Sequence, residues 1–126
     1  MPALNEPFNL GDLLKYEEDC LNYSRDQVTV ASGQNLELGA VVARVTATGK
    51  VKRLSPGAAD GTEQPAGLLL GACDATLIER DDAVLLARHA VVASHAVTWP
   101  LGITPEQKVS ATTALEARGI LIRQSA

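Results

Sequence analysis

The sequence predicts a single, mainly β domain of the α+β class that ends in one helix. Apolar runs of strand length are separated by Gly, Pro and charged residues, and a strong helix start signal lies near the C-terminus. The chain has 126 residues, enough for one domain with one modest core. Aromatic residues make up only 3% of it, so we expect a core of Ala, Val and Leu side chains.

Residues 1–27 differ from the rest and are predicted to form an N-terminal arm, ahead of a β-rich body over residues 28–126. The arm holds Phe8, Tyr16 and Tyr23, which are the only Phe and both Tyr of the chain. Aromatic side chains are favoured as interface anchors. Two interpretations stay open at this point: the arm binds a partner, or it folds back onto its own body.

The next part of the chain is typical of short paired strands. A strand is expected over residues 27–31, and a hairpin over residues 40–46 and 50–54, joined by a Thr-Gly turn. Alternation in its second strand predicts that Val51 and Leu54 face inward and the lysines outward.

Two apolar runs then follow, within residues 60–74 and 83–92, on either side of the charged residues 79–82. Their length and flanking glycines favour strands buried on both faces, with residues 79–82 as a polar connection. Residues 93–97 either continue the second strand or turn.

The clearest local signal is a helix over residues 105–118. Thr104 is a good N-cap, Pro105 suits the first helical position, Gln107 completes a capping box, and Gly119 suits the end. A small apolar inner stripe and a last short strand complete this region: Ala111, Ala114 and Leu115, then residues 120–122.

Motifs that carry chemistry are missing from the sequence, and we expect no catalytic residue, metal site or cofactor. Cys20, Cys73, His89 and His95 are the soft metal ligands, and they lack the close pairs of zinc sites. No motif supports a nucleophilic pair of Cys73 with His89. Cys73 also follows an apolar strand, where a thiol is usually buried and inert.

Charge and hydropathy exclude further classes of partner. The formal charge is −4 and the pI is about 5.1, which argues against nucleic acid binding. No apolar run reaches about 18 residues, so no membrane span is predicted. The N-terminus lacks the pattern of a signal peptide, so we expect synthesis in the cytoplasm with both thiols reduced.

A family resemblance rests on short motifs and their order. The body motifs are Asp60-Gly61-Thr62, Ala66-Gly67-Leu68-Leu69, Ala72-x-Asp74, Trp99-Pro100 and Gly119-Ile120-x-Ile122. Upstream come residues 34–39, Thr48-Gly49-Lys50, Leu13-Leu14-Lys15-Tyr16 and Tyr23-Ser24-Arg25. In this order and spacing, which cover most of the chain, the sequence resembles the head decoration proteins of tailed phages, the bacteriophage lambda type. Its N-terminal region is longer than that of the lambda type, so individual arm contacts cannot be transferred.

The resemblance implies a fold and a function. It implies a small β-clip-like body and a capsid decoration (cement) protein of the virion, made in the host bacterial cytoplasm. Such proteins bind the major capsid protein on the outside of the expanded head, as homotrimers at local three-fold sites, and stabilise the shell against the pressure of packaged DNA. The alternative is another small β adaptor, spike or enzyme domain.

Within that picture we expect particular residues at each interface. The predicted capsid-binding residues are Leu10, Leu13, Leu14 and Tyr16. Trp99 and Pro100 are predicted either at the trimer interface or simply in the core.

Overall fold

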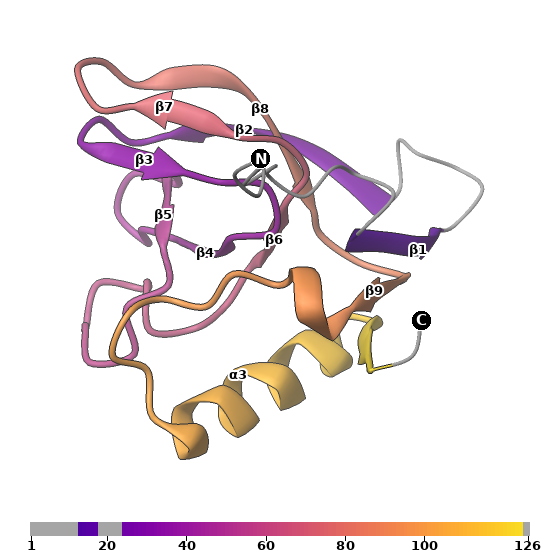
Figure 1. The fold of residues 1–126 in the computed structure, drawn as a ribbon. Helices are drawn as coiled ribbons and strands as arrows, with labels where there is room; N and C mark the ends of the chain where they lie inside the picture. The colour runs from indigo at the N-terminus through magenta and orange to yellow at the C-terminus, as the bar shows by residue number, and fades with distance from the viewer. Residues whose placement is uncertain (1–12, 18–23, 125–126) are drawn as a thin grey trace, which may run out of the picture.

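A computed structural model describes residues 13–17 and 24–124 of the chain. The mainly β class with one C-terminal helix is confirmed (Figure 1). Among these residues the elements are β1 (Leu14–Glu17), β2 (Arg25–Val30), β3 (Gln34–Leu36), β4 (Val41–Arg44), β5 (Val51–Arg53), β6 (Gly67–Leu69), β7 (Cys73–Ala75), β8 (Arg80–Leu86), β9 (Ala90–Ala93), a 3-10 turn (Ser94–Ala96), α3 (Pro105–Ala117) and β10 (Ile120–Arg123).

The centre of the fold is a closed five-stranded barrel in the order β2-β5-β4-β6-β8. Antiparallel pairing of β8 with both β6 and β2 closes it, with Leu68 opposite Leu86 and Val28 opposite Ala83. Its interior is filled by small aliphatic side chains, which suits a barrel of so few strands. The two short strands β3 and β7 form a separate antiparallel pair beside it.

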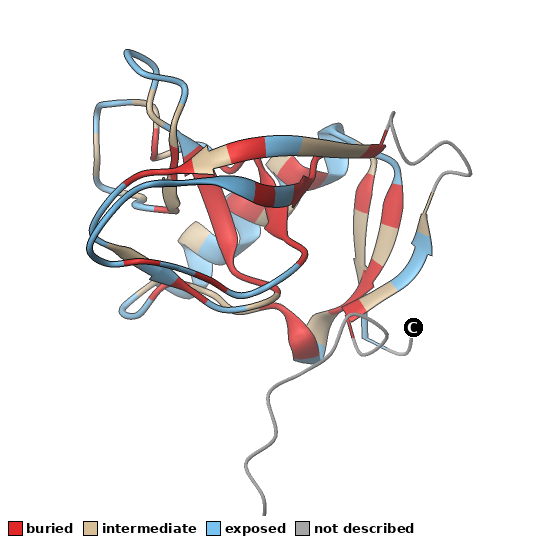
Figure 2. Ribbon diagram, turned by 90° about the horizontal axis from the view of Figure 1, so that it is seen from above, coloured by how far each residue is buried: buried red, intermediate tan, exposed pale blue. Residues whose placement is uncertain are grey.

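A second sheet, in the order β1-β9-β10, lies at one end of the barrel together with α3 (Figures 1 and 2). Strand β9 is central, because it pairs antiparallel with β1 and parallel with β10. A second core fills the space between this layer and the outer face of the barrel, and it includes Leu13, Leu68, Leu86 and Leu115.

The two cores explain why the first apolar run has no polar face. Leu69 points into the barrel core, whereas Leu68 and Leu70 belong to the second core. Strand β6 is therefore buried on both sides, as predicted, because the outside of the barrel is covered by the second sheet and α3.

The helix prediction is confirmed in detail. The Thr104 Oγ1 accepts a hydrogen bond from the Gln107 amide at 3.2 Å, and the Gln107 Oε1 accepts one from the Thr104 amide at 3.0 Å. Gly119 follows the C-cap with φ of +81°. Ala111 and Leu115 of the predicted inner stripe are buried, whereas the third member, Ala114, is only half-buried. The last strand follows directly as β10.

The prediction of a polar connection at residues 79–82 is wrong. Strand β8 begins at Arg80, and its first three residues are exposed while still pairing toward β2. The second apolar run is also two strands, because the chain turns at His89, whose φ is +55°. Val84 is 37% exposed, so β8 is buried on both faces only at its C-terminal end.

A substitution at Gly39 tests how closely the barrel approaches the segment that precedes α3. Gly39 has φ of +85°, its carbonyl accepts from the Thr98 amide at 2.9 Å, and an added Cβ would clash with the backbone carbonyl of Ala96. We expect Gly39→Ala to lower the free energy of unfolding by about 3 kcal/mol or more, because backbone strain and a clash with fixed backbone add. Chemical denaturation measures this change.

Gly49→Ala is the matched control. Gly49 has φ of +71° and open space around its Cβ position, so strain alone should cost about 1–2 kcal/mol. Equal losses for the two variants would contradict the close approach at Gly39.

Candidate interaction surfaces

Strand β1 is built into the body at the point where the predicted arm would leave it. Leu13 is fully buried in the second core, and Leu14 is half-buried against the same core. Leu14 pairs with Val92 and Tyr16 with Val91, across a register shift. Strand β1 therefore forms one edge of the second sheet.

Glu17 at the end of β1 holds this edge to the start of β2. Its carboxylate accepts from the Arg25 Nε at 2.7 Å, from the other end of the same guanidinium at 2.8 Å, and from the Ser24 hydroxyl at 2.6 Å. The Arg25 hydrogen bonds hold the pKa of Glu17 below its usual value, against the opposing effect of burial. A two-point contact of this kind fixes direction as well as distance.

The four predicted capsid-binding residues have different environments. Leu10 lies outside the described residues. Leu13 lies in the core, so it cannot contact another protein without leaving that core. Leu14 is half-buried, and Tyr16 is 58% exposed on the edge strand. Contact with the capsid stays a prediction for all four, and Tyr16 is the described one that is accessible in place.

Trp99 and Pro100 also differ in how far they are buried. Pro100 is buried, which suits core packing. Trp99 is partly exposed and packs against the second core, and with Val109 and Ile122 it lines a hollow of about 400 Å³ beside α3. The Lys108 Nζ lies 5.8 Å from the centre of the Trp99 ring. A place at a trimer interface stays a prediction for both residues.

The sequence analysis did not predict a pair of large aliphatic side chains that are exposed to solvent. Leu77 and Ile78, in the connection from β7 to β8, are 92% and 66% exposed. The available signal was their position directly before the predicted polar connection at residues 79–82, where two adjacent aliphatic residues have no core to fill.

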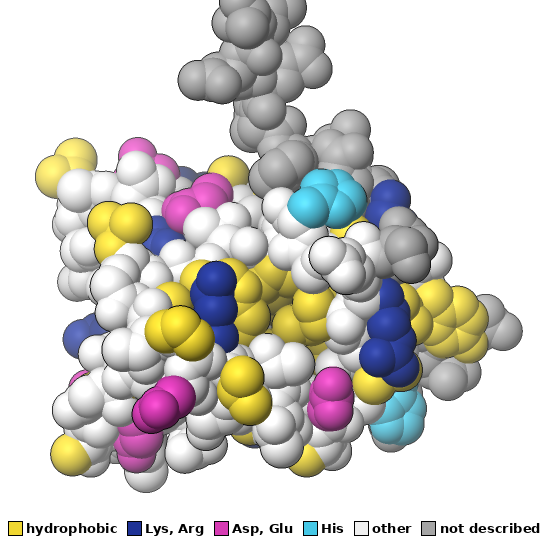
Figure 3. All heavy atoms as spheres, turned by 60° about the horizontal axis from the view of Figure 1, so that its bottom comes forward, with side chains coloured by type: hydrophobic (Ala, Val, Ile, Leu, Met, Phe, Trp, Pro, Cys, Tyr) yellow, Lys and Arg dark blue, Asp and Glu magenta, His cyan; other side chains and the backbone are white. Residues whose placement is uncertain are grey.

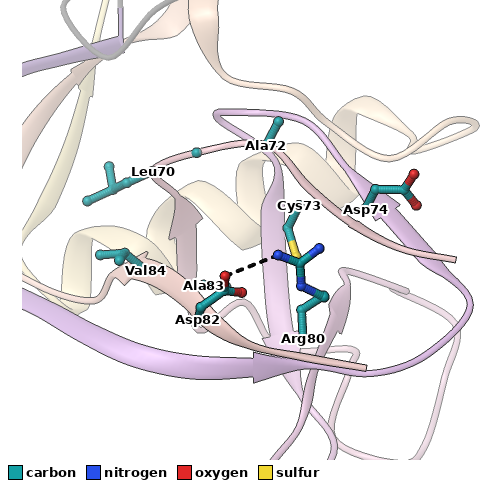
Figure 4. A pocket seen from close by; sticks show the side chains of 9 residues that line it. Leu70, Ala72, Cys73, Asp74, Arg80, Asp82, Ala83 and Val84 are labelled. Carbon is teal, nitrogen blue, oxygen red and sulfur yellow. Dashed lines mark hydrogen bonds and ion pairs between the residues drawn. The ribbon is translucent and has the colours of Figure 1, made fainter. Parts of the chain in front are cut away.

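A small cavity of about 200 Å³ lies beside Cys73, as Figure 4 shows. Arg80 and Asp82 border it and form an ion pair at 3.1 Å. Burial raises the pKa of the Cys73 thiol, which disfavours the reactive thiolate. His89 does not line this cavity, so the structure does not bring the considered pair of Cys73 and His89 together there.

The described residues, 13–17 and 24–124, offer neither a metal cluster nor a membrane-spanning helix. They contain no group of three or more His, Cys, Asp or Glu side chains placed to hold a metal ion. No helix in this part of the chain is both long and apolar enough to cross a bilayer.

Comparison with known proteins gives one family. The model of the bacteriophage lambda head decoration protein D family matches residues 3–120. A search of curated proteins found no match.

The Glu17 contact makes a pH-dependent prediction. A folded-state pKa below the ordinary value of 4.5 means that ionised Glu17 stabilises the fold above that value, and that this stability is lost as the pH falls through the folded pKa. We expect Glu17→Gln to lower the free energy of unfolding by about 1–2 kcal/mol at pH 7, and the difference from wild type to shrink toward zero below pH 4.5. Denaturation curves from pH 3 to 7 measure it.

Glu79→Gln is the matched control. Glu79 also forms one ion pair, with Lys50, but its side chain is 49% exposed, against 9% for Glu17. Its substitution should cost well under about 1 kcal/mol, because exposed pairs contribute little. A Glu17 effect that is as small, or that does not change with pH, would contradict the assigned role of the contact.

Proposed function

The chain belongs to the family of bacteriophage lambda head decoration protein D, and from this premise we propose that it binds the expanded phage head as trimers at local three-fold sites. As a member of this family it is a capsid decoration protein of the virion, a structural protein and not an enzyme. The proposed partner is the major capsid protein, and the proposed place of synthesis is the cytoplasm of the host bacterium. The match over residues 3–120 is the observation that carries the proposal.

The proposed role is to hold the shell against the internal pressure of packaged DNA. A protein on the outer surface does not contact that DNA, and the formal charge of −4 is compatible with this position. Decoration also supplies stability by mass action, because any partner that binds only the expanded shell favours that state.

The geometry of β1 supports attachment through the N-terminal segment. Leu13 in the core, the pairing of β1 with β9, and the Glu17–Arg25 contact together fix the chain where residues 1–12 join the body. A pull on that segment would therefore act on the packed core. Three such segments in one trimer would bind multivalently, so modest single contacts would give tight attachment.

Co-sedimentation with empty heads of the cognate phage tests the proposal. Full-length protein is expected to bind expanded heads and not unexpanded ones. Deletion of residues 2–12 should weaken binding at least tenfold, and Tyr16→Ser about fivefold, which corresponds to about 1 kcal/mol for a partly exposed aromatic anchor. Decorated heads filled with DNA should also retain it to a higher temperature than bare heads.

The deletion stops before Leu13 so that β1 and the second core stay intact, and a melting curve checks that they do. Leu101→Ser, at a fully exposed residue far along the chain, is the control for loss of a surface apolar group. Equal binding by the deletion variant would contradict attachment through residues 1–12. No binding to expanded heads by the full-length protein would contradict the proposed function itself.

A further inference from the structure

One end of the molecule carries an apolar tip that the fold holds in place. The tip is Leu77 and Ile78, between β7 and β8, and Figure 1 shows this connection at the upper left, away from α3. On one side the Asp74 carboxylate accepts from the Thr76 amide and hydroxyl, at 3.1 and 2.5 Å. On the other side Lys50 pairs with Glu79 at 2.5 Å. The two aliphatic side chains are therefore presented to solvent by a braced turn.

A different face carries an apolar hollow. It lies beside α3, holds about 400 Å³, and is lined by Trp99, Val109 and Ile122 together with the methyl-bearing side chains of Thr112 and Thr113. Figure 3 shows the face that carries α3, with apolar side chains on the floor of a hollow and Lys or Arg side chains beside it. Val109 is 67% exposed, so much of this apolar surface faces water in a single copy.

Acidic side chains are in excess around the tip, and the hollow has a basic side chain at one end. Lys108 lies at the hollow and makes no ion pair with any carboxylate in the described ranges. Asp74 and Asp81 flank the tip, and neither forms an ion pair within 4 Å among the described residues. Arg80 also lies at the tip and attracts Asp74, but its ion pair is with Asp82, so the acidic side chains there remain in excess. Glu116 is eight residues along α3 from Lys108, about 12 Å away, so the hollow has one basic end.

A projecting patch and a receiving patch on different faces of one chain are the parts of a head-to-tail contact, which makes a closed ring if the rotation between copies closes. We propose that copies of this chain join by this contact, with Leu77 and Ile78 of one copy seated in the hollow of the next. Three such contacts form the ring, and Asp74 or Asp81 faces Lys108 across each. The inference rests on the trimer of the proposed function and names the surfaces that build it.

This arrangement also assigns different positions to the two predicted trimer residues. Trp99 lines the receiving hollow and contacts the neighbouring copy. Pro100, which is buried, supports Trp99 from within its own chain.

Disulfide trapping tests the contact. In a background with Cys20→Ser and Cys73→Ala, the double variant Ile78→Cys with Val109→Cys is oxidised, both as concentrated free protein and bound to expanded heads. A closed ring of tip-and-hollow contacts predicts covalent trimers on a non-reducing gel. The single variants Ile78→Cys and Val109→Cys should give no cross-linked product, since Ile78 of one copy faces Val109 of the next and neither faces its own counterpart.

Covalent dimers from either single variant would overturn the inference, because they would place like residues together. Absence of cross-linking by the double variant, both free and on heads, would overturn it as well. If the protein still binds expanded heads as trimers in that case, the proposed function stands and only this contact fails.

An independent variant avoids cysteine chemistry. Leu77→Ser with Ile78→Ser should raise the concentration at which trimers dissociate at least tenfold, measured by sedimentation of the free protein and by stoichiometry on heads. Both side chains are in solvent in the single copy, so the melting temperature of the monomer should not fall. Leu101→Ser removes a fully exposed apolar group that belongs to neither the tip nor the hollow, and it should leave trimers intact. Trimers that resist the tip variant as well as the control would overturn the inference.

Discussion

The closure of the barrel between β6 and β8 is the constraint on which the other elements depend. Gly67 begins β6 where the backbone carbonyl of Leu86 occupies the space of a Cβ, so any side chain there would push the two strands apart. Strand β8 also pairs with β2, so this one contact closes the ring. The chain then passes directly from β8 into β9, which organises the second sheet. The position of β1, β10 and α3 therefore follows from how β8 is seated.

Small side chains allow one strand to contribute to both cores. Consecutive residues of β4 and β6 alternate between the two cores, as Val41 and Val42 do, so each strand separates two packed regions. Closely packed interiors of this kind tolerate little change in volume. The scarcity of aromatic residues in the body is thus a packing requirement of a narrow barrel with a second layer against its wall. Among the large apolar side chains outside the cores, Trp99, Leu77 and Ile78 lie where the cores end.

The sequence allowed the local elements to be predicted and left the long-range pairing undetermined. The helix was predictable because its capping residues act within one turn, and the hairpin of β4 and β5 because its alternation and turn are adjacent. The start of β8 was missed because Arg80, Asp81 and Asp82 lie on a part of the strand with no buried face, where polarity imitates a loop. The break at His89 was missed because a non-glycine residue there takes a positive φ, which composition does not reveal.

The pairing of β1 is a second example of a long-range contact that local sequence patterns do not reveal. The sequence left open whether residues 14–17 bind a partner or fold back onto the body, and β1 pairs with a strand more than seventy residues away. No local pattern identifies that partner, and Leu13 differs from Leu14 in burial only because of the sheet that forms around it. Of the candidate surfaces, Trp99 was predictable from its isolation, whereas the tip required knowledge of which loop protrudes.

Strand β8 links the surfaces on which the two proposals rest. It begins just beyond the tip and ends just before β9, to which β1 is paired. A load applied at the N-terminal segment would reach β9 through hydrogen bonds along the sheet, and from β9 it would follow the covalent chain through β8 to the tip. In a ring closed by tips and hollows, that path would continue into the neighbouring copy through α3 and Trp99. Attachment to the shell and contact between copies would then transmit force through the same strand, so a rigid, closed barrel around it serves assembly as much as folding.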